Sequence, residues 1–246
     1  MSSNKWDIYN PRLWYRDDLK NHPELIPLEG QTVDYETVGN LAKAYNGSVL
    51  LSTPLTKLQG DYFTNGSISL KVNKFDGLYV PTGLFGDTMS VNNISHTTDQ
   101  WLTGDPNVNS MHTVTIKFDK PTLLTEYWMI AAIGTATIID KERPSPKHWL
   151  VYGSNDSERW DVLDERDESA DNWGYWHINS YNPNIVKAYR YIKIVISAWH
   201  PTEDSTLSTG LKRLYLFGRP SDKFTLPNIP SPNDSFVWVV PNRELD

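Results

Sequence analysis

Tryptophans set among polar residues are the part of this sequence with the clearest chemical use. Trp173, Tyr175 and Trp176 lie together in a polar segment, and Trp199 and His200 directly follow an apolar run. An indole face can stack on the apolar face of a pyranose while nearby polar groups fix the orientation of the ring. The predicted carbohydrate site comprises Trp173, Trp176, Trp199, His200, Arg143 and Asp140, with Glu203 as a further polar candidate.

The same tryptophans have a second interpretation. They could plug the ends of a β-structure or form an interface with a neighbouring subunit, because large aromatic side chains serve in cores and interfaces as well as in ligand sites. The sequence alone leaves both uses open.

The segment Asp161–Asp171 (DVLDERDESAD) is a run of closely spaced carboxylates. A glycosidase needs two carboxylates about 5 to 9.5 Å apart. Like charges this close in sequence repel one another, which is more typical of a solvated loop than of a dry active site. We therefore interpret the run as an exposed connection.

Motifs of known catalytic centres are missing from the sequence. It has no GxSxG elbow, no HExxH, no P-loop and no GxGxxG. Its 6 histidines are widely spaced, with no pair at metal-ligand spacing, and it has no cysteine for a disulfide, a thiolate zinc site or a nucleophile. The sequence thus predicts a binding protein with no catalytic residue, no metal ligand and no cofactor.

Charge and hydropathy exclude two classes of partner. The net charge is −7, and the 23 Lys and Arg residues are scattered, so we expect no nucleic-acid binding. No run approaches the roughly 18 apolar residues that a membrane span requires, so we expect no membrane insertion. Met1–Trp14 lacks the basic and apolar regions of a signal peptide, and we expect the chain to fold in a cytosol.

Short β-like runs must position the candidate residues. From Gly47 to about Gly218, apolar runs are separated by Gly, Pro, Asn and Asp, and Thr113–Phe118 and Tyr191–Ser197 alternate apolar and polar residues. Strands at this spacing predict a mainly β protein with a β-sandwich. Further predicted strands are Leu123–Ile133, His148–Tyr152 and Leu211–Phe217, and the predicted core tryptophans are Trp101, Trp149 and Trp160.

One helix is predicted, over Asp34–Tyr45. Val38, Leu41, Ala42 and Tyr45 recur at helical spacing and define one apolar face. Asp34 is suited to the N-cap, and the following Asn46-Gly47 is suited to the left-handed exit.

Aromatic residues also gather at the start of the chain, in Trp6–Leu19. Trp6, Tyr9, Trp14 and Tyr15 are predicted to form an assembly interface, with a buried packing strand as the equal alternative. Near the other end, Phe236–Val240 reads as a strand that needs a partner elsewhere in the chain.

Several blocks in the right order resemble the discoidin domain, also called the F5/8 type C or galactose-binding-like fold. They are TTDQWLTGDP (Thr97–Pro106), MHTVTIKFDKP (Met111–Pro121), PKHWLVYGSNDSERWDVL (Pro146–Leu163), AYRYIKIVIS (Ala188–Ser197) and LKRLYLFGR (Leu211–Arg219). This resemblance implies a jelly-roll β-sandwich whose loops at one end bind sugars, lipid headgroups or proteins. Most members of that family are binding modules.

The resemblance departs from the family pattern at the structural calcium site. Asn92–His96 lacks the usual Asp-Gly turn, and Arg213 stands where the family has a Glu. An arginine removes both the charge and the oxygen that calcium needs, so we do not expect the ion.

The flanking segments resemble a bacteriophage tail-collar domain. IPLEGQTVDYETVGNLAKAYNG (Ile26–Gly47) is similar to its Gly-Gln turn and helix, and KFTLPNIP (Lys223–Pro230) to its following strand. The two resemblances together imply a discoidin-like domain inserted into a small α+β collar-like base. The expected division is an arm at 1–25, a base at 26–56 and 221–246, and a jelly roll at 57–220.

These resemblances imply a phage virion protein of the tail, baseplate or fibre. Its expected partners are other virion proteins, further copies of itself and a host-surface glycan, and its expected location is the virion, assembled in the bacterial cytoplasm. The alternative is a free-standing bacterial carbohydrate-binding module.

Overall fold

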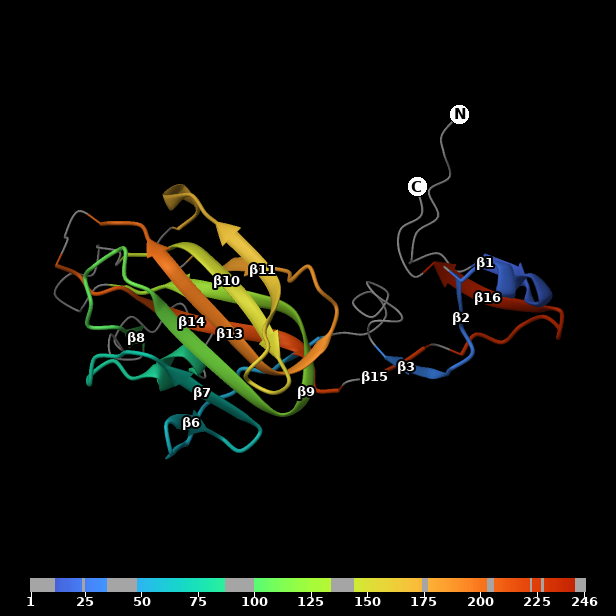
Figure 1. Cartoon of the computed structure of the whole chain (residues 1–246), viewed down its shortest axis with the longest axis horizontal. Helices are drawn as coiled ribbons and strands as arrows, with labels where there is room; N and C mark the ends of the chain where they lie inside the picture. The colour runs from blue at the N-terminus through green and yellow to red at the C-terminus, as the bar shows by residue number, and fades with distance from the viewer. Residues whose placement is uncertain are drawn as a thin grey trace. The chain divides into compact units, whose positions relative to one another are not determined.

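The computed structural model describes residues 12–23, 25–34, 48–86, 100–133, 144–173, 177–202, 206–221, 223–226 and 228–241. The chain forms two compact units, both drawn in Figure 1. Residues 49–185 and 189–220 make up the sandwich unit, and residues 1–48, 186–188 and 221–246 make up the terminal unit.

Antiparallel strands build the sandwich unit, as the alternation of apolar and polar residues predicts. The pairing order is β11-β10-β13-β9-β7-β6-β5; β12 pairs with β9, and β14 pairs with β9, β4 and β8. The strands are β4 (Val49–Leu50), β5 (Lys57–Gln59), β6 (Tyr62–Thr64), β7 (Ile68–Val72), β8 (Trp101–Leu102), β9 (His112–Ala131), β10 (Pro146–Ser154), β11 (Asp161–Asp167), β12 (Asn179–Tyr181), β13 (Ala188–Trp199) and β14 (Gly210–Arg219). Two 3-10 turns, η2 (Pro81–Phe85) and η3 (Ala170–Asn172), belong to the same unit.

The long strand β9 contributes to both sheets of the sandwich. Residues up to Phe118 pair with β7, and residues from Leu123 onward pair with β14 and β12. Pro121 lies between the two parts and has no N–H to donate to a ladder, which suits a point where the strand passes from one sheet to the other. The predicted mainly β sandwich is therefore confirmed.

The inward faces of both sheets form one apolar core. Ile116, Ile194 and Leu214 are completely buried in it, on three different strands. Trp101 and Trp149 are also completely buried, which confirms the prediction for these two tryptophans.

The prediction for Trp160 is wrong. Its side chain is partly exposed, and the Lys193 ammonium lies 3.8 Å from the centroid of its ring. The turn between β10 and β11 places this indole outside the core, where its Nε1 donates a hydrogen bond to the Ser157 carbonyl at 3.1 Å.

Arg213 lies on β14 and is only 3% exposed. Its Nη1 donates to the carbonyl oxygen of Gly83 in η2 at 2.9 Å and to that of Lys212 at 2.8 Å. A Cβ at Gly86 would lie 2.8 Å from the guanidinium carbon, so glycine there leaves space for the arginine. A calcium ion would have to share these carbonyl oxygens with a fixed cation, and the residues present therefore do not fit one.

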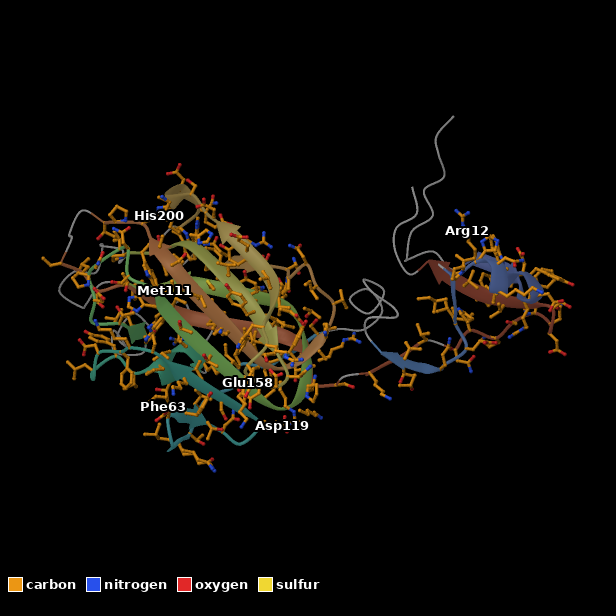
Figure 2. The ribbon with its side chains drawn as sticks, viewed as in Figure 1. Arg12, Phe63, Met111, Asp119, Glu158 and His200 are labelled. Carbon is orange, nitrogen blue, oxygen red and sulfur yellow. The ribbon has the colours of Figure 1, made fainter. Side chains whose placement is uncertain are left out.

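The sandwich unit has two ends. Figure 2 labels His200 and Met111 near one of them, the His200 end, and Asp119 and Glu158 near the other, the Asp119 end. Val49 of β4 pairs with Gly218 of β14, and Gly218 also pairs with Leu124 of β9. Leu124 follows Asp119 by a few residues on β9, so this pairing lies toward the Asp119 end of the sandwich.

His112 begins β9 inside the core of the His200 end. Its ring is 2% exposed and contacts the edges of Trp101 and Trp199, with centroids 6.3 and 5.8 Å away. Neither ring nitrogen has a hydrogen-bond partner in the part of the chain that the structure describes. Burial lowers the pKa of the His112 imidazole, and the charge of Asp105 opposes this only in part.

We expect His112 to make the sandwich less stable in mild acid. The unfolded chain binds a proton at this histidine below a pH of about 6.5, whereas the folded state keeps the ring neutral to lower pH. The free energy of unfolding should therefore fall as the pH drops below about 6.5, by up to roughly 1.4 kcal/mol per pH unit. Urea titrations of the wild type and His112→Phe between pH 8 and 5 check this, and parallel pH dependences would contradict it.

The terminal unit contains two small sheets. Strand β16 (Phe236–Pro241) lies between β1 (Arg12–Tyr15) and β2 (Leu25–Pro27), and β15 (Lys223–Thr225) pairs with β3 (Thr32–Asp34). The strand expected at Phe236–Val240 is thus confirmed, and both of its partners come from the N-terminal segment. The turn η1 (Arg16–Asn21) follows β1.

The aromatic N-terminal segment contributes to this sheet as well. Trp14 packs against a small core of Leu25, Val237 and Val239, whereas Tyr15 is 50% exposed and contacts Phe236 edge-on. Trp14 therefore packs within a strand, which is the alternative to its predicted place in an assembly interface. Trp6 and Tyr9 lie outside the described residues, as does the predicted helix after Asp34. In the described ranges, no helix has the length and apolar character needed to cross a bilayer.

Candidate functional site

Two of the predicted sugar-stacking residues are core residues. Trp173 is 4% exposed and meets Trp149 edge-on, with ring centroids 6.2 Å apart. Trp199 is 2% exposed, and its Nε1 donates to the carbonyl oxygen of Ser110 at 3.2 Å. Neither indole presents a face on which a pyranose could stack, so the interpretation in which they close the end of the sandwich holds for both.

His200 supports the loop that follows β11. Its backbone N–H donates to the carbonyl oxygen of Ser145, and its Nε2 lies 2.7 Å from the carbonyl oxygen of Glu168. Because a carbonyl can only accept, Nε2 carries the proton. The remaining predicted residues, Trp176, Arg143 and Asp140, lie outside the described part of the chain, as do Tyr175 and Glu203.

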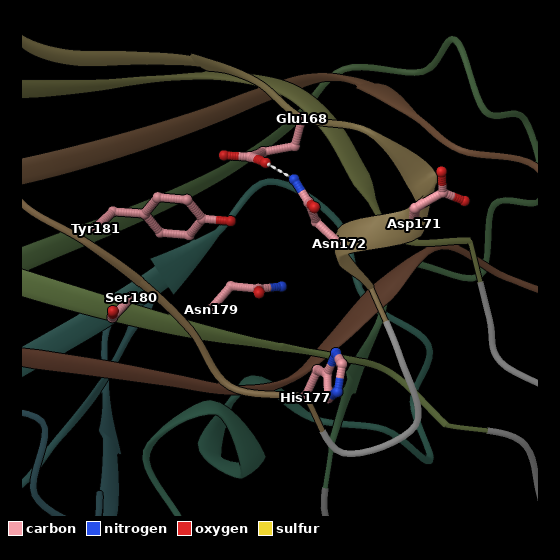
Figure 3. Close-up of a pocket in the computed structure, with 7 residues that line it drawn as sticks. All are labelled: Glu168, Asp171, Asn172, His177, Asn179, Ser180 and Tyr181. Carbon is pink, nitrogen blue, oxygen red and sulfur yellow. Dashed lines mark hydrogen bonds between the residues drawn. The ribbon is translucent and has the colours of Figure 1, made fainter.

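A polar pocket lies beside His200, at the connection between β11 and β12. Its volume is about 410 Å³. Figure 3 shows its lining, which we call the Glu168 pocket: Glu168, Asp171, Asn172, His177, Asn179, Ser180 and Tyr181.

Backbone and side-chain hydrogen bonds hold the acidic side of the pocket. The Glu168 N–H donates to the carbonyl oxygen of Lys147 at 2.8 Å, and the Glu168 carboxylate accepts a short hydrogen bond from the amide of Asn172. Ser169 caps η3, where its hydroxyl accepts from the backbone N–H of Asp171 at 3.3 Å. These bonds fix Glu168 and Asn172 next to each other, as Figure 3 shows.

The interpretation of Asp161–Asp171 as an exposed connection is right about exposure for most of the residues but wrong about the loop. Most of the run forms β11, paired with β10, and Asp164 is only 2% exposed. Its Oδ2 accepts from the hydroxyl of Tyr127 and from Nε of Arg166, both at 2.8 Å. A buried carboxylate needs such partners, and they come from distant positions that the local charge pattern does not reveal.

Tyr181 forms the apolar wall of the pocket and connects it to the core. Its ring stacks on Tyr127 with centroids 5.2 Å apart, and the Arg166 guanidinium lies 5.3 Å from its centroid on a cation–π contact. Burial raises the pKa of Tyr181, and the negative charge of Glu168 raises it further. The phenol therefore stays protonated at neutral pH and can donate a hydrogen bond.

Asn179 is the residue of the pocket with an unsatisfied group. Its Nδ2 is shielded from solvent and has no hydrogen-bond partner within the described ranges. A buried donor left unpaired costs about 1–3 kcal/mol, so such groups are rare without a reason. An acceptor on a bound molecule would satisfy it.

The pocket combines hydrogen-bonding groups of both kinds. Two carboxylates can accept, the amides of Asn172 and Asn179 and the hydroxyl of Ser180 can donate or accept, and His177 adds an imidazole. No cluster of three or more acidic or histidine side chains suited to a metal ion occurs among the residues that the structure describes. The arrangement suits a small polar molecule that carries several hydroxyl groups.

Of the predicted site residues, Trp173 and Trp199 are buried, and the prediction for Trp176, Arg143 and Asp140 stays a prediction. The polar residues that follow Trp173, from His177 to Tyr181, were the available signal, since Asn and Ser between aromatic residues mark a hydrogen-bonding surface. Their position beside Glu168 depends on the pairing of β12 with β9, which the local pattern does not specify.

No protein-family model matches the sequence, and no curated protein matches it. Similar solved structures exist. A protein fragment from Bacteroides thetaiotaomicron has a TM-score of 0.49 and 18% identity, over 68% of this chain and 97% of that one. The module CBM32-3 of a family 31 glycoside hydrolase from Clostridium perfringens has a TM-score of 0.47 and 11% identity, over 67% and 100%. The family 32 module of C. perfringens NanJ, in complex with galactose, has a TM-score of 0.44 and 8% identity, over 61% and 93%.

At these identities the likeness concerns the fold alone. Two of these structures are family 32 carbohydrate-binding modules. Their TM-scores lie below 0.5, and the mainly β sandwich of this chain rests on its own strand pairing. None of them supports the resemblance of the flanking segments to a phage tail-collar domain.

Proposed function

We propose that the sandwich unit is a carbohydrate-binding module and that the Glu168 pocket holds a neutral sugar. The observation that carries this proposal is Asn179, whose shielded Nδ2 lacks an acceptor in a pocket lined by polar groups. A sugar hydroxyl or ring oxygen supplies such an acceptor, and sugar hydroxyls also donate to carboxylates.

The pocket's size and charge favour a neutral sugar. A volume of about 410 Å³ lies within the range of roughly 300–1,000 Å³ that small-ligand sites have. Glu168 and Asp171 make the pocket acidic, so they would repel the carboxylate of an acidic sugar but accept hydrogen bonds from hydroxyl groups.

We propose binding without hydrolysis. The Glu168 carboxylate accepts a hydrogen bond from Asn172. Figure 3 shows that the Asp171 carboxylate points away from the Glu168 carboxylate. A hydrolase would need both carboxylates on opposite sides of a glycosidic bond. Release of reducing sugar from a bound oligosaccharide by the full chain would overturn this part of the proposal.

A role in a phage tail rests only on the resemblance of Ile26–Gly47 and Lys223–Pro230 to a tail-collar domain. The similar solved structures support neither virion partners nor self-assembly. We therefore favour the alternative, a bacterial carbohydrate-binding module.

The test is a glycan array with the full chain, followed by calorimetric titration of the best neutral glycan. We expect Asn179→Ala and Glu168→Gln each to weaken binding about tenfold or more, which corresponds to the loss of one well-placed hydrogen bond in a ligand site. Asn179→Ala should leave the melting temperature unchanged or raise it, because it removes a buried unpaired donor.

Glu158→Gln is the matched control. Glu158 is exposed at the Asp119 end, so the same change of charge should leave affinity unaffected. Wild-type affinity in both pocket variants, or no glycan bound by the folded chain, would contradict the proposal.

A further inference from the structure

A second pocket lies at the Asp119 end, remote from the Glu168 pocket. It has a volume of about 330 Å³. Its walls come from three places in the sandwich: the β5–β7 region, β9 just before its bend, and the start of β13. We call it the Arg190 pocket after its central cation, and its polar lining includes Gln59, Ser67, Ser69, Lys117, Asp119 and Arg190.

Hydrogen bonds that each involve the main chain hold the walls of this pocket together. Arg190 donates from Nη1 to the carbonyl oxygen of Asp119 at 3.2 Å, and the N–H of Asp119 donates to the carbonyl oxygen of Ser67 at 3.0 Å. The backbone N–H of Arg190 donates to the side-chain oxygen of Asn155 at 2.9 Å. These hydrogen bonds connect the three walls, and the two cations, Lys117 and Arg190, belong to strands β9 and β13.

The two cations of the pocket have no carboxylate partner among the residues that the structure describes. Neither Lys117 nor Arg190 forms an ion pair within the part of the chain that the structure describes. The Lys117 ammonium lies 5.7 Å from the centroid of Tyr191, and a single bond to a carbonyl oxygen leaves Arg190 with further N–H donors. Both groups can thus bind an anion.

The sign of the charge here is opposite to that of the whole chain. The protein carries a net charge of −7, yet this pocket has two cations against one carboxylate, that of Asp119. Arginine binds carboxylate and sulfate groups through paired N–H donors, and a nearby lysine adds a point charge. Around these cations stand Ser67, Ser69 and Gln59, whose side chains can hydrogen-bond the hydroxyl groups of a sugar.

We propose that the Arg190 pocket binds an anionic oxygen group, a carboxylate or sulfate, carried by an acidic sugar. This second site is independent of the Glu168 pocket. The acidic Glu168 pocket favours a neutral sugar, and the cationic Arg190 pocket favours an anionic one. Asp119 limits affinity by repelling the anion and does not contribute a contact.

The experiment titrates the full chain with methyl β-D-glucuronide, with methyl β-D-glucoside as the neutral counterpart and with inorganic sulfate. We expect the glucuronide to bind in low salt and to bind more weakly as salt screens the cations. Arg190→Gln and Lys117→Gln should each weaken binding about tenfold, whereas Asp119→Asn should tighten it several-fold. Lys20→Gln is the control for charge, because Lys20 is exposed in η1 and lies outside the sandwich unit.

The outcomes separate the two sites and the two sources of the anion. Glucuronide binding that survives Asn179→Ala but fails in Arg190→Gln supports the proposal whether or not the Glu168 pocket binds sugar. If inorganic sulfate binds as tightly as the glucuronide, the pocket is an anion site, and its ligand is a free anion and not a sugar. Two results would overturn the proposal. One is equal affinity of Arg190→Gln, Lys20→Gln and the wild type for the glucuronide, and the other is a loss of glucuronide binding in Asn179→Ala alone.

Discussion

Replacing Trp149 by alanine should cost the sandwich unit about 4 kcal/mol of its free energy of unfolding. The indole is completely buried and contacts Trp173 and Tyr181 edge-on, so its loss opens a large cavity in the core. Its Nε1 also donates to the hydroxyl of Tyr127 at 2.9 Å, and that hydroxyl donates to the buried Asp164. The variant therefore loses core packing, and it also removes the hydrogen bond that orients the Tyr127 hydroxyl toward the buried Asp164 carboxylate.

The damage should extend to the Glu168 pocket, because the cavity lies directly behind Tyr181. Urea titration of the full chain gives the loss of stability, and hydrogen exchange of the β12 amides reports whether the wall of the pocket loosens with it. Trp160→Ala removes the same side chain from the outer surface, where the indole has one hydrogen bond and one cation–π contact. We expect a cost of about 1 kcal/mol there. Equal losses in the two variants would show that burial of Trp149 is not what stabilises this region.

The fold could largely be predicted from the sequence because the signals that specify strands are local. Alternation in Thr113–Phe118 and Tyr191–Ser197 identifies strands with one buried face, and both runs lie inside longer strands of the structure. The strand at Phe236–Val240 was equally visible. Its partners were not, because β1 and β2 lie more than two hundred residues away along the chain and no local pattern links them.

The candidate sites were less predictable because burial of a side chain at the end of a sandwich depends on distant segments. Trp199 follows a strand and resembles a sugar platform in the sequence, yet Ser110 and His112 cover it. Asp164 belongs to an acidic run, yet Tyr127, 37 residues earlier, supplies the hydroxyl that makes its burial tolerable. The pocket residues are ordinary polar types, and only the three-dimensional pairing of strands brings them together.

Replacing Gly218 by alanine adds one methyl group and should strongly destabilise the sandwich. Gly218 lies on β14 at a shift of register, where Phe217 pairs with Glu126 and Gly218 pairs with Leu124. A Cβ built there would lie 2.0 Å from the carbonyl oxygen of Leu123 and 3.0 Å from a methyl group of Leu51. Backbone cannot move aside as a flexible side chain can, so β14 must separate locally from β9 or from β4.

We expect Gly218→Ala to lower the free energy of unfolding by about 3 kcal/mol, at the upper end of what overpacking costs. Gly77→Ala is the matched control, since no heavy atom lies within 4 Å of a Cβ at that position and its backbone does not require glycine. Hydrogen exchange should become faster at Leu51, whose N–H donates to the carbonyl oxygen of Leu216 at 2.7 Å, while the strands of the β10–β11 pair keep their protection. Because Val49 and Gly218 pair where the chain enters and leaves the sandwich, this loss would loosen the closure of the unit at that end. Unchanged stability in Gly218→Ala would mean that β14 and β9 do not approach as closely as the register requires.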